Sequence, residues 1–251
     1  MGIVKLSPKL KVLCGLQANL ETDKNLELVI DGGFLLHKCA SRGDAAEKLV
    51  LNNDVNGIAR QCAREIERFE KRGLAVWLVF DGCPPPAKGC TGDGRRETRE
   101  GYERDARRLL GEAGAMAQVH KLCAQACSFG PRTVARIATL LRPMIKGRIM
   151  TAPGEADPQI AVVEETIRAR GADVMVYGND SDLAVLGVRK LLHKIKERHG
   201  VLTGWFYDLR LLIEPSTWVF TKDSPACLPS SAPRSTARAG REVHQHTSVG
   251  P

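Results

Sequence analysis

The sequence predicts an α/β fold with a mainly parallel sheet and helices on both faces. Two observations predict it. Four short runs rich in Val, Ile, Leu and Met suit strands that are covered on both faces. Helix-period patterns lie between these runs, which is typical of alternating strands and helices. The length of 251 residues favours one domain, or one domain with a large insertion.

Each element has its own local pattern. The strand-like runs are Glu27 to Asp31, Leu74 to Asp81, Arg148 to Thr151 and Asp173 to Tyr177, and Leu191 to Ile195 is a candidate fifth strand. Apolar residues at helical spacing predict helices over Val55 to Lys71 and Gln159 to Arg170.

The connection from Asp81 to Arg148 is far longer than a crossover between strands needs. From Lys88 to Arg148 it carries 13 Lys and Arg against 6 Asp and Glu, in a chain of formal net charge +8. A local excess of this kind favours contact with a polyanion, although a solvated helical surface is the simpler alternative. We expect residues 82–147 to form a basic helical insertion over one edge of the sheet.

The end of the chain has a different composition. Residues 220–251 are rich in Ser, Pro, Ala and Arg without periodicity, so we expect a disordered tail after a folded domain over residues 1–219. No stretch approaches the roughly 18 apolar residues of a membrane span, so we expect no membrane partner.

Acidic residues follow each of the four predicted strands: Asp31, Asp81, Glu155 with Asp157, and Asp180 with Asp182. Because the carboxyl ends of parallel strands meet at one rim, the six carboxylates should converge there. Two carboxylates 4 Å apart repel by about 4 kcal/mol at an effective dielectric near 20. Bound cations remove this repulsion, and all-oxygen ligands suit Mg²⁺ or Mn²⁺. Two such ions can drive phosphodiester hydrolysis.

Each acidic motif alone is weak, because Asp is common in turns and helix caps. The repetition at four strand ends, together with a basic insertion, favours a metal site next to a phosphate-binding surface.

Five motifs resemble a known family. They are VIDGGFLLHKCA, LVFDGCPPPAK, APGEADPQIA, GNDSDLAVLG and the start MGI. In this order and at these spacings, residues 1–212 resemble the structure-specific 5′ nucleases, a family that includes flap endonuclease, exonuclease 1 and the xeroderma pigmentosum group G nuclease. The LHK at Leu36 to Lys38 and the FDGC at Phe80 to Cys83 look most like the exonuclease 1 branch.

The resemblance implies a PIN-like nuclease fold, a basic helical arch and two Mg²⁺ ions, with Mn²⁺ as a substitute. It assigns the six carboxylates to the metal site, and Lys88 and Arg95 to the scissile phosphate. On an uninterrupted helix, residues seven apart share a face, which Arg99 continues. Further DNA contacts are expected at Gly2, His37, Lys38, Arg96 and Arg99.

Besides Lys5, which stands where the family usually has a second glycine, the sequence departs from this family at three places. No helix–two-turn–helix pattern is visible after Tyr207 to Pro215, so duplex binding and the second ion are in doubt. Three glycines, at positions 89, 92 and 94, lie between Lys88 and Arg95 and predict a loose segment. Asp157 followed by Pro158 predicts a helix that begins after Glu155, with Asp157 as its N-cap.

The function expected from these features is a Mg²⁺-dependent 5′ nuclease acting on DNA with 5′ ends, flaps or junctions, as a monomer in the nucleus. Two alternatives remain open. One is a truncated, catalytically impaired DNA-binding module of the same fold, and the other is a PIN-type ribonuclease.

Overall fold

The computed structural model describes residues 6–20, 25–83, 89–112, 114–213, 218–219 and 228–229. Gly2 and Lys88, two of the predicted site residues, lie outside these ranges. So does the predicted tail over residues 220–251, except Leu228–Pro229.

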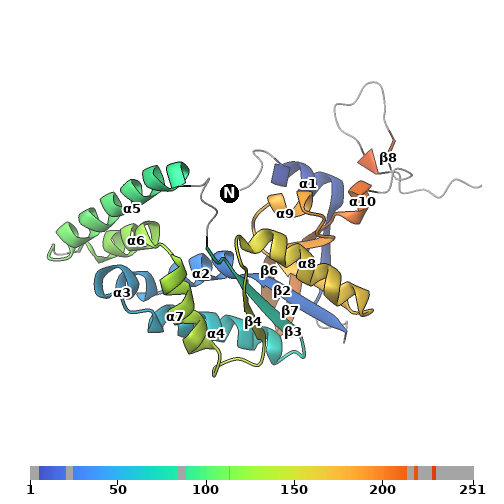
Figure 1. Cartoon of the computed structure of the whole chain (residues 1–251), viewed down its shortest axis with the longest axis horizontal. Coiled ribbons are helices and arrows are strands. Elements are labelled where there is room, and N and C mark those ends of the chain that lie inside the picture. The colour runs from blue at the N-terminus through green and yellow to red at the C-terminus, as the bar shows by residue number, and fades with distance from the viewer. Residues whose placement is uncertain are drawn as a thin grey trace, which may run out of the picture.

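One seven-stranded sheet organises the molecule, in the order β1-β7-β6-β5-β2-β3-β4 (Figure 1). Its strands are β1 (Gly15–Asn19), β2 (Leu26–Asp31), β3 (Ala75–Phe80), β4 (Arg148–Thr151), β5 (Asp173–Tyr177), β6 (Lys190–Arg198) and β7 (Val201–Asp208). Neighbouring strands from β6 to β4 are parallel, and β7 is antiparallel to both β6 and β1. A separate pair joins β8 (Trp218–Val219) to β9 (Leu228–Pro229). The predicted mainly parallel sheet is therefore confirmed.

Helices cover both faces of the sheet, as predicted. The chain forms α1 (Leu6–Cys14), α2 (Gly32–Ala40), α3 (Ala45–Asn52), α4 (Asn56–Glu70), α5 (Gly89–Leu109), α6 (Met116–Ala126), α7 (Pro131–Leu141), α8 (Ala156–Ala169), α9 (Asp182–Val185) and α10 (Arg210–Ile213). Residues of α2, α3, α4, α6 and α7 share one core with one face of the sheet, and residues of α1, α8 and α9 share a second core with the other face. Among the described helices, none combines the length and apolar character needed to cross a membrane.

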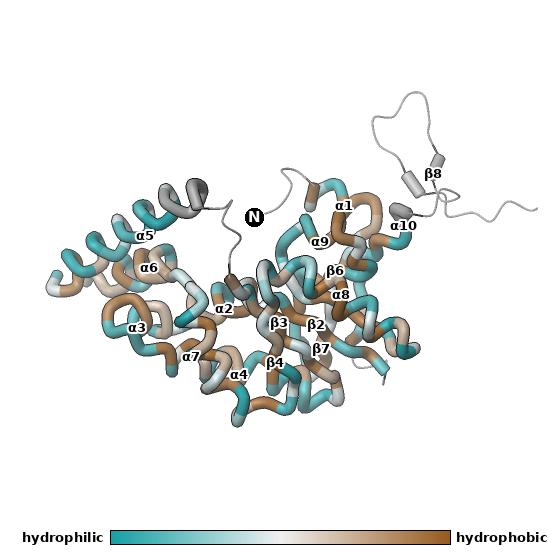
Figure 2. The backbone as a smooth tube through the Cα atoms, in the orientation of Figure 1, coloured by the Kyte–Doolittle hydropathy of each residue, from teal (hydrophilic) through white to brown (hydrophobic). Residues whose placement is uncertain are grey.

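The central strands alternate their side chains between these two cores. In β2, Leu28 and Ile30 pack with α2, α3 and α4, whereas Val29 packs with α8. In β3, Leu78 and Val79 are divided in the same way. Because both faces are covered, these strands are almost continuously apolar, and they contrast with the hydrophilic α5 (Figure 2).

The long insertion is helical, as expected, and consists of α5, α6 and α7. It packs on other helices more than on the sheet: α5 lies against α6, α6 against α3, and α7 against α4. Figure 1 shows α5 and α6 as an arm beside the body of the protein. The helix α5 begins at Gly89 and includes all three glycines of the segment that the sequence marks as loose.

One prediction about local structure is wrong. Asp157 is not the N-cap of α8, because the helix begins at Ala156 with Glu155 in the capping position. The backbone N–H of Ala156 donates to Asp81 Oδ1 at 2.8 Å, which gives the first turn a partner from another strand end. Pro158 lies within that first turn, where its missing N–H costs no helical hydrogen bond.

Candidate functional site

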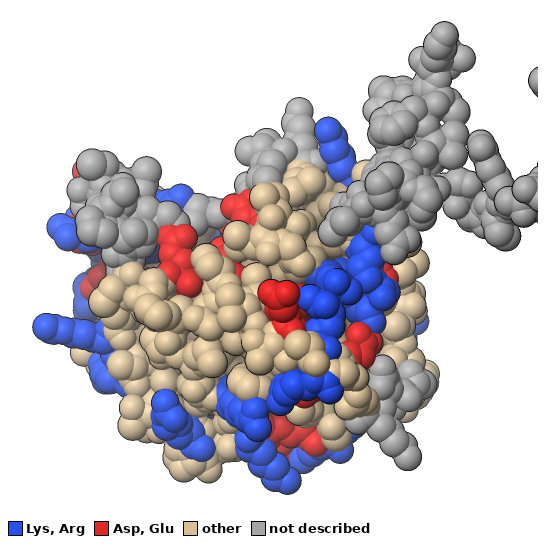
Figure 3. All heavy atoms as spheres, turned by 45° about the vertical axis from the view of Figure 1, so that its right-hand side comes forward, with Lys and Arg blue, Asp and Glu red and all other residues tan. Residues whose placement is uncertain are grey.

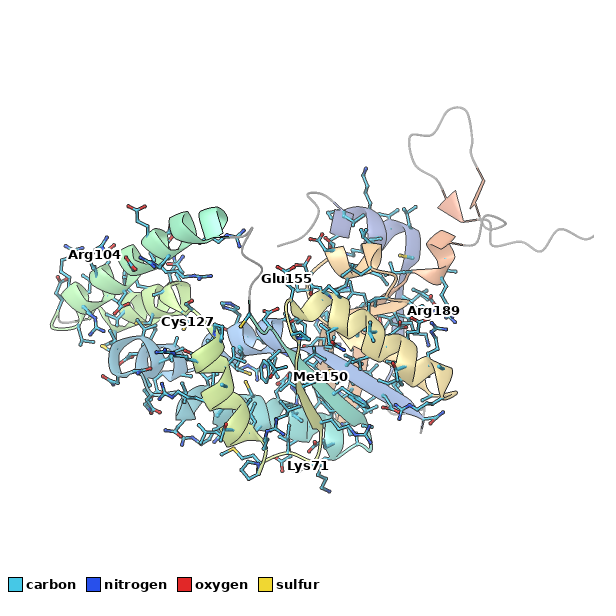
Figure 4. The ribbon with its side chains drawn as sticks, viewed as in Figure 1. Lys71, Arg104, Cys127, Met150, Glu155 and Arg189 are labelled. Atoms are coloured by element: carbon cyan, nitrogen blue, oxygen red, sulfur yellow. The ribbon has the colours of Figure 1, made fainter. Side chains whose placement is uncertain are left out.

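A pocket of about 940 Å³ lies at the carboxyl ends of the parallel strands. All six carboxylates that the sequence singled out line it: Asp31, Asp81, Glu155, Asp157, Asp180 and Asp182. Asp81 is exposed and the other five are half-buried. Figure 4 shows Glu155 facing the space between the arm and α8, and Figure 3 shows acidic side chains in the hollow beside the arm.

Two of the carboxylates are fixed by helix N-termini. Asp31 Oδ1 accepts the N–H of Phe34 at 3.2 Å and so caps α2, while Asp81 accepts the N–H of Ala156 at the start of α8. A Cβ added to Gly33 would lie 3.3 Å from Asp31 Oδ1 and 3.6 Å from Asp81 Oδ2, so both carboxylates border the same small space. A glycine there leaves this space open.

Glycine is also required after β3. A Cβ on Gly82 would lie 1.9 Å from the carbonyl oxygen of Ala152, and its N–H donates to Gly154 O at 2.7 Å. This close approach holds the ends of β3 and β4 together. It therefore places Asp81 next to the loop that carries Glu155.

Asp180 comes from the turn after β5, and Asp182 is the first residue of α9. The N–H of Asp182 donates to Asp180 Oδ1 at 3.0 Å, which is the turn hydrogen bond that such short Asp motifs favour. The turn alternative is thus correct for Asp180, and both side chains still line the pocket.

Burial and nearby negative charges raise the pKa of two of the carboxyls. Burial, followed by the charges of Asp157 and Asp81, raises the pKa of Asp31 to about 7, although hydrogen bonds from backbone N–H groups act to lower it. Burial, followed by the charge of Asp180 and its acidic neighbours, raises the pKa of Asp157 to about 6. Like charges disfavour ionisation, so a cation bound here would relieve this repulsion.

The donor set fits a hard divalent cation in its chemistry, because every candidate ligand is a carboxylate oxygen. Its arrangement is open: among the described residues, no group of three His, Cys, Asp or Glu side chains is placed to hold a metal ion. The structure therefore brings the six predicted ligands to one pocket without assembling them into a closed metal centre.

Basic and aromatic side chains line the same pocket as the carboxylates. Arg95, the exposed residue that the sequence predicts to meet phosphate, extends from α5 to line the pocket. His37 also lines it, with its ring edge-on to Phe129 at a centroid distance of 5.0 Å. Phe34 lies edge-on to Tyr177, also at 5.0 Å. The pocket thus combines negative, positive and aromatic groups.

Three other predicted DNA contacts do not line this pocket. Lys38 turns its ammonium to Glu65 and to the hydroxyl of Tyr177. Arg96 forms an exposed ion pair with Glu100 at 3.3 Å, and Arg99 donates to Ser128 Oγ at 3.2 Å.

Phe34, Phe129, Val185 and Leu186 line the pocket but were not predicted from the sequence. Phe34 could have been predicted to lie near the site, because it is three residues after Asp31, which caps the helix α2. No local pattern links Phe129, in the insertion, to the same pocket.

Comparison with known proteins gives relatives but no family model, since none matches the chain. The chain is 27% identical over 202 residues to the DNA damage-inducible protein DIN7 of Saccharomyces cerevisiae, covering 80% of this chain and 45% of the relative. It is 28% identical over 178 residues to exonuclease 1 of Xenopus laevis, covering 68% of this chain and 22% of the relative. The chain therefore spans less than half the length of these relatives.

Among solved structures, the catalytic core of Rad2 in complex with DNA substrate matches with a TM-score of 0.50 at 20% identity, over 80% of this chain and 52% of that chain. This likeness supports the fold alone. The sequence relatives confirm the resemblance that the motifs predicted, to the structure-specific 5′ nuclease family and its exonuclease 1 members.

Proposed function

We propose that this chain is the nuclease domain of a Mg²⁺-dependent 5′ nuclease that hydrolyses DNA near 5′ ends, flaps or junctions. The observation that carries the proposal is the meeting of six carboxylates from four strand ends in one pocket, opposite Arg95 of the basic arm. The named relatives include exonucleases, which agrees with this chemistry. As in the sequence-based expectation, the domain would act on DNA in the nucleus.

The six carboxylates would hold the ions. When bound, a pair of divalent cations supplies an activated water and offsets charge on the phosphodiester. Arg95 would bind the phosphate and stabilise the charge that develops on it. Lys88 would join it from just before α5, as the motif implies. His37 and Phe34 would border the nucleotide, and the helix N-termini beneath Asp31 and Asp81 would keep those two side chains oriented.

We predict that Asp81→Asn lowers cleavage of a 5′-flap DNA by at least about 100-fold, because even outer-sphere partners of metal ligands are worth 10–100-fold. The amide keeps an oxygen that can accept the N–H of Ala156, so the fold should be preserved. Cleavage in Mg²⁺ and in EDTA is the measurement, and only the Mg²⁺ reaction of the unmodified chain should proceed. DNA binding, measured in EDTA, should persist in the variant.

Asp105→Asn on α5 is the matched control, because Asp105 is exposed and does not line the pocket. It should cleave like the unmodified chain. Equal activity of Asp81→Asn and the unmodified chain would refute the assignment of the pocket.

One observation favours a second candidate, a DNA-binding module without cleavage. In the described part of the chain, no three His, Cys, Asp or Glu side chains are placed so that they could hold a metal ion together. Salt-sensitive DNA binding with no Mg²⁺-dependent cleavage would support this module. A PIN-type ribonuclease would instead prefer RNA over flap DNA of equal length in direct competition.

A further inference from the structure

A second pocket, of about 350 Å³, lies at the other end of the sheet from the carboxylates. It is formed at the amino ends of β3 and β4 and includes Glu27 of β2. Charged and aromatic side chains define it: Glu27, Glu70, Trp77, Lys146, Arg148 and Arg170.

Trp77 is the centre of this pocket. The Arg148 guanidinium lies 4.5 Å from the centroid of the Trp77 ring, and that of Arg170 lies 5.8 Å from it. Glu27 accepts the indole N–H at 2.6 Å and a hydrogen bond from Arg170 at 3.2 Å. The ring is therefore held by its edge while Arg148 covers it, a favourable cation–π arrangement.

Both acidic side chains of the pocket are already engaged. Glu27 holds Trp77 and Arg170, and Glu70 Oε1 accepts the backbone N–H groups of Lys146 at 2.9 Å and Gly147 at 2.6 Å. In the described part of the chain, the exposed side chains of Lys146 and Arg148 form no ion pair. A guanidinium carries five donors, so the pocket offers hydrogen-bond donors and positive charge to an external acceptor.

Beside the pocket runs the free edge of β4, the last strand in the sheet order. Ala152 donates its N–H to Phe80 O at 2.8 Å, and residues alternate along a strand, so Met150 also directs its main chain to β3. Ile149 and Thr151 then direct theirs outward. Within the described ranges, no backbone hydrogen bond outside the sheet engages these two residues. Such an edge can pair with another strand.

We propose that the edge of β4 and the adjoining pocket form a docking site for an extended acidic segment of a partner protein. The segment adds a strand to the sheet at Ile149 and Thr151 and places a carboxylate against Lys146 and Arg148. This is recognition by strand addition, in which main-chain hydrogen bonds give affinity and a pocket gives specificity. A nucleic acid fits less well, because Arg148 already covers the indole on which a base would stack.

The test uses the full chain and fluorescence anisotropy of a labelled short peptide in which Val and Thr alternate before two terminal Asp residues. The same peptide ending in Asn is the uncharged comparison. We expect the acidic peptide to bind at least about tenfold more tightly than the uncharged one, and Arg148→Glu to remove that difference. Ile149→Pro, which deletes an outward N–H at an edge position that tolerates proline, should weaken both peptides.

Arg104→Glu is the matched charge reversal, since Arg104 lies on α5, far across the molecule from Met150 of β4 (Figure 4). It should leave peptide binding unchanged. Equal binding of the two peptides, or an Arg148→Glu variant that binds like Arg104→Glu, would overturn the proposal. So would displacement of the acidic peptide by single-stranded DNA at a concentration similar to that of unlabelled peptide, which would mark the site as one for nucleic acid.

Discussion

Lys38 shows how a buried partner decides the role of a charged residue. Its neighbour His37 lines the carboxylate pocket, whereas Lys38 on the same helix reaches Glu65 and Tyr177. Glu65 is fully buried and also binds Arg42 at 2.8 Å and Arg68 at 2.9 Å. In the sequence, Glu65 lies next to the apolar residues that form the buried face of α4. That pattern does not indicate which basic side chains from other parts of the chain pair with the Glu65 carboxylate.

We predict that Glu65→Gln lowers the free energy of unfolding by about 3 kcal/mol at pH 7. Burial raises the pKa of Glu65, but hydrogen bonds and charges from Lys38 and Arg42 outweigh it and lower the pKa to about 2, from an ordinary value of 4.5. A depressed carboxyl pKa contributes stability above pH 4.5, and that contribution is lost as the pH falls towards 2. Urea unfolding of both proteins across this range measures it.

Glu67→Gln is the control for this prediction, because Glu67 forms an exposed ion pair with Lys71, the residue that follows α4. Its effect should stay below about 0.5 kcal/mol at every pH. A difference between Glu65→Gln and the unmodified chain that does not shrink below pH 4 would show that the carboxylate charge is not the cause.

At the scale of elements, the predictable strands were those with continuous apolar runs, and they include the edge strand β4. β2, β3 and β5 are buried on both sides, so their apolar runs are visible without knowledge of the fold. The edge strand β1, with the sequence GLQAN, was not predicted because it is short, largely exposed and defined by its pairing with β7. β7 contains Gly204, where a Cβ would lie 2.7 Å from Leu192, so its glycine reflects close packing that no local pattern reveals.

At the start of α8, a strong local sequence preference predicts the wrong helix boundary. Asp157 and Pro158 have strong local preferences for the cap and the first helical position. The helix nevertheless begins at Ala156, whose N–H is held by Asp81 from another strand end. A tertiary hydrogen bond thus decides a boundary that local preference places two residues later.

For α5 we predict that Gly94→Ala stabilises the helix by about 1 kcal/mol, the difference in helix propensity between the two residues. An added Cβ there meets no atom within 4 Å, so only the propensity changes. Amide hydrogen exchange in α5 should slow by about fivefold. Gly82→Ala provides the contrast, because its Cβ would collide with Ala152 O and should destabilise the protein. Faster exchange in Gly94→Ala would contradict this account of the arm.

At the scale of the whole molecule, parallel topology made the carboxylate pocket predictable. Each acidic motif is ambiguous by itself, but strands that run in the same direction bring their ends to one rim. The geometry within that rim was not predictable. Among the described residues, no three such side chains are placed to hold an ion, and their placement depends on rotamers that a sequence pattern does not give.

The charge distribution gives the last prediction. Most of the excess positive charge belongs to the insertion, and the structure brings Arg95 from it to the pocket while Arg96 pairs with Glu100. Each phosphate contact contributes about 0.9 to the slope of log affinity against log salt concentration. We therefore expect Arg95→Gln to reduce the slope for 5′-flap DNA by about one, and Arg96→Gln to reduce it less.

The measurement is the affinity for 5′-flap DNA in EDTA at several concentrations from low to moderate salt. It distinguishes specific contacts of Arg95 and Arg96 with the DNA from a general effect of net charge. Arg132→Gln on α7 is the reference, because it removes the same charge from an exposed position that does not line the pocket. If affinity depends only on net charge, the three variants will change the slope equally. If the arm binds the phosphate next to the carboxylates, Arg95→Gln will differ from the other two, because Arg95 alone of the three lines the pocket.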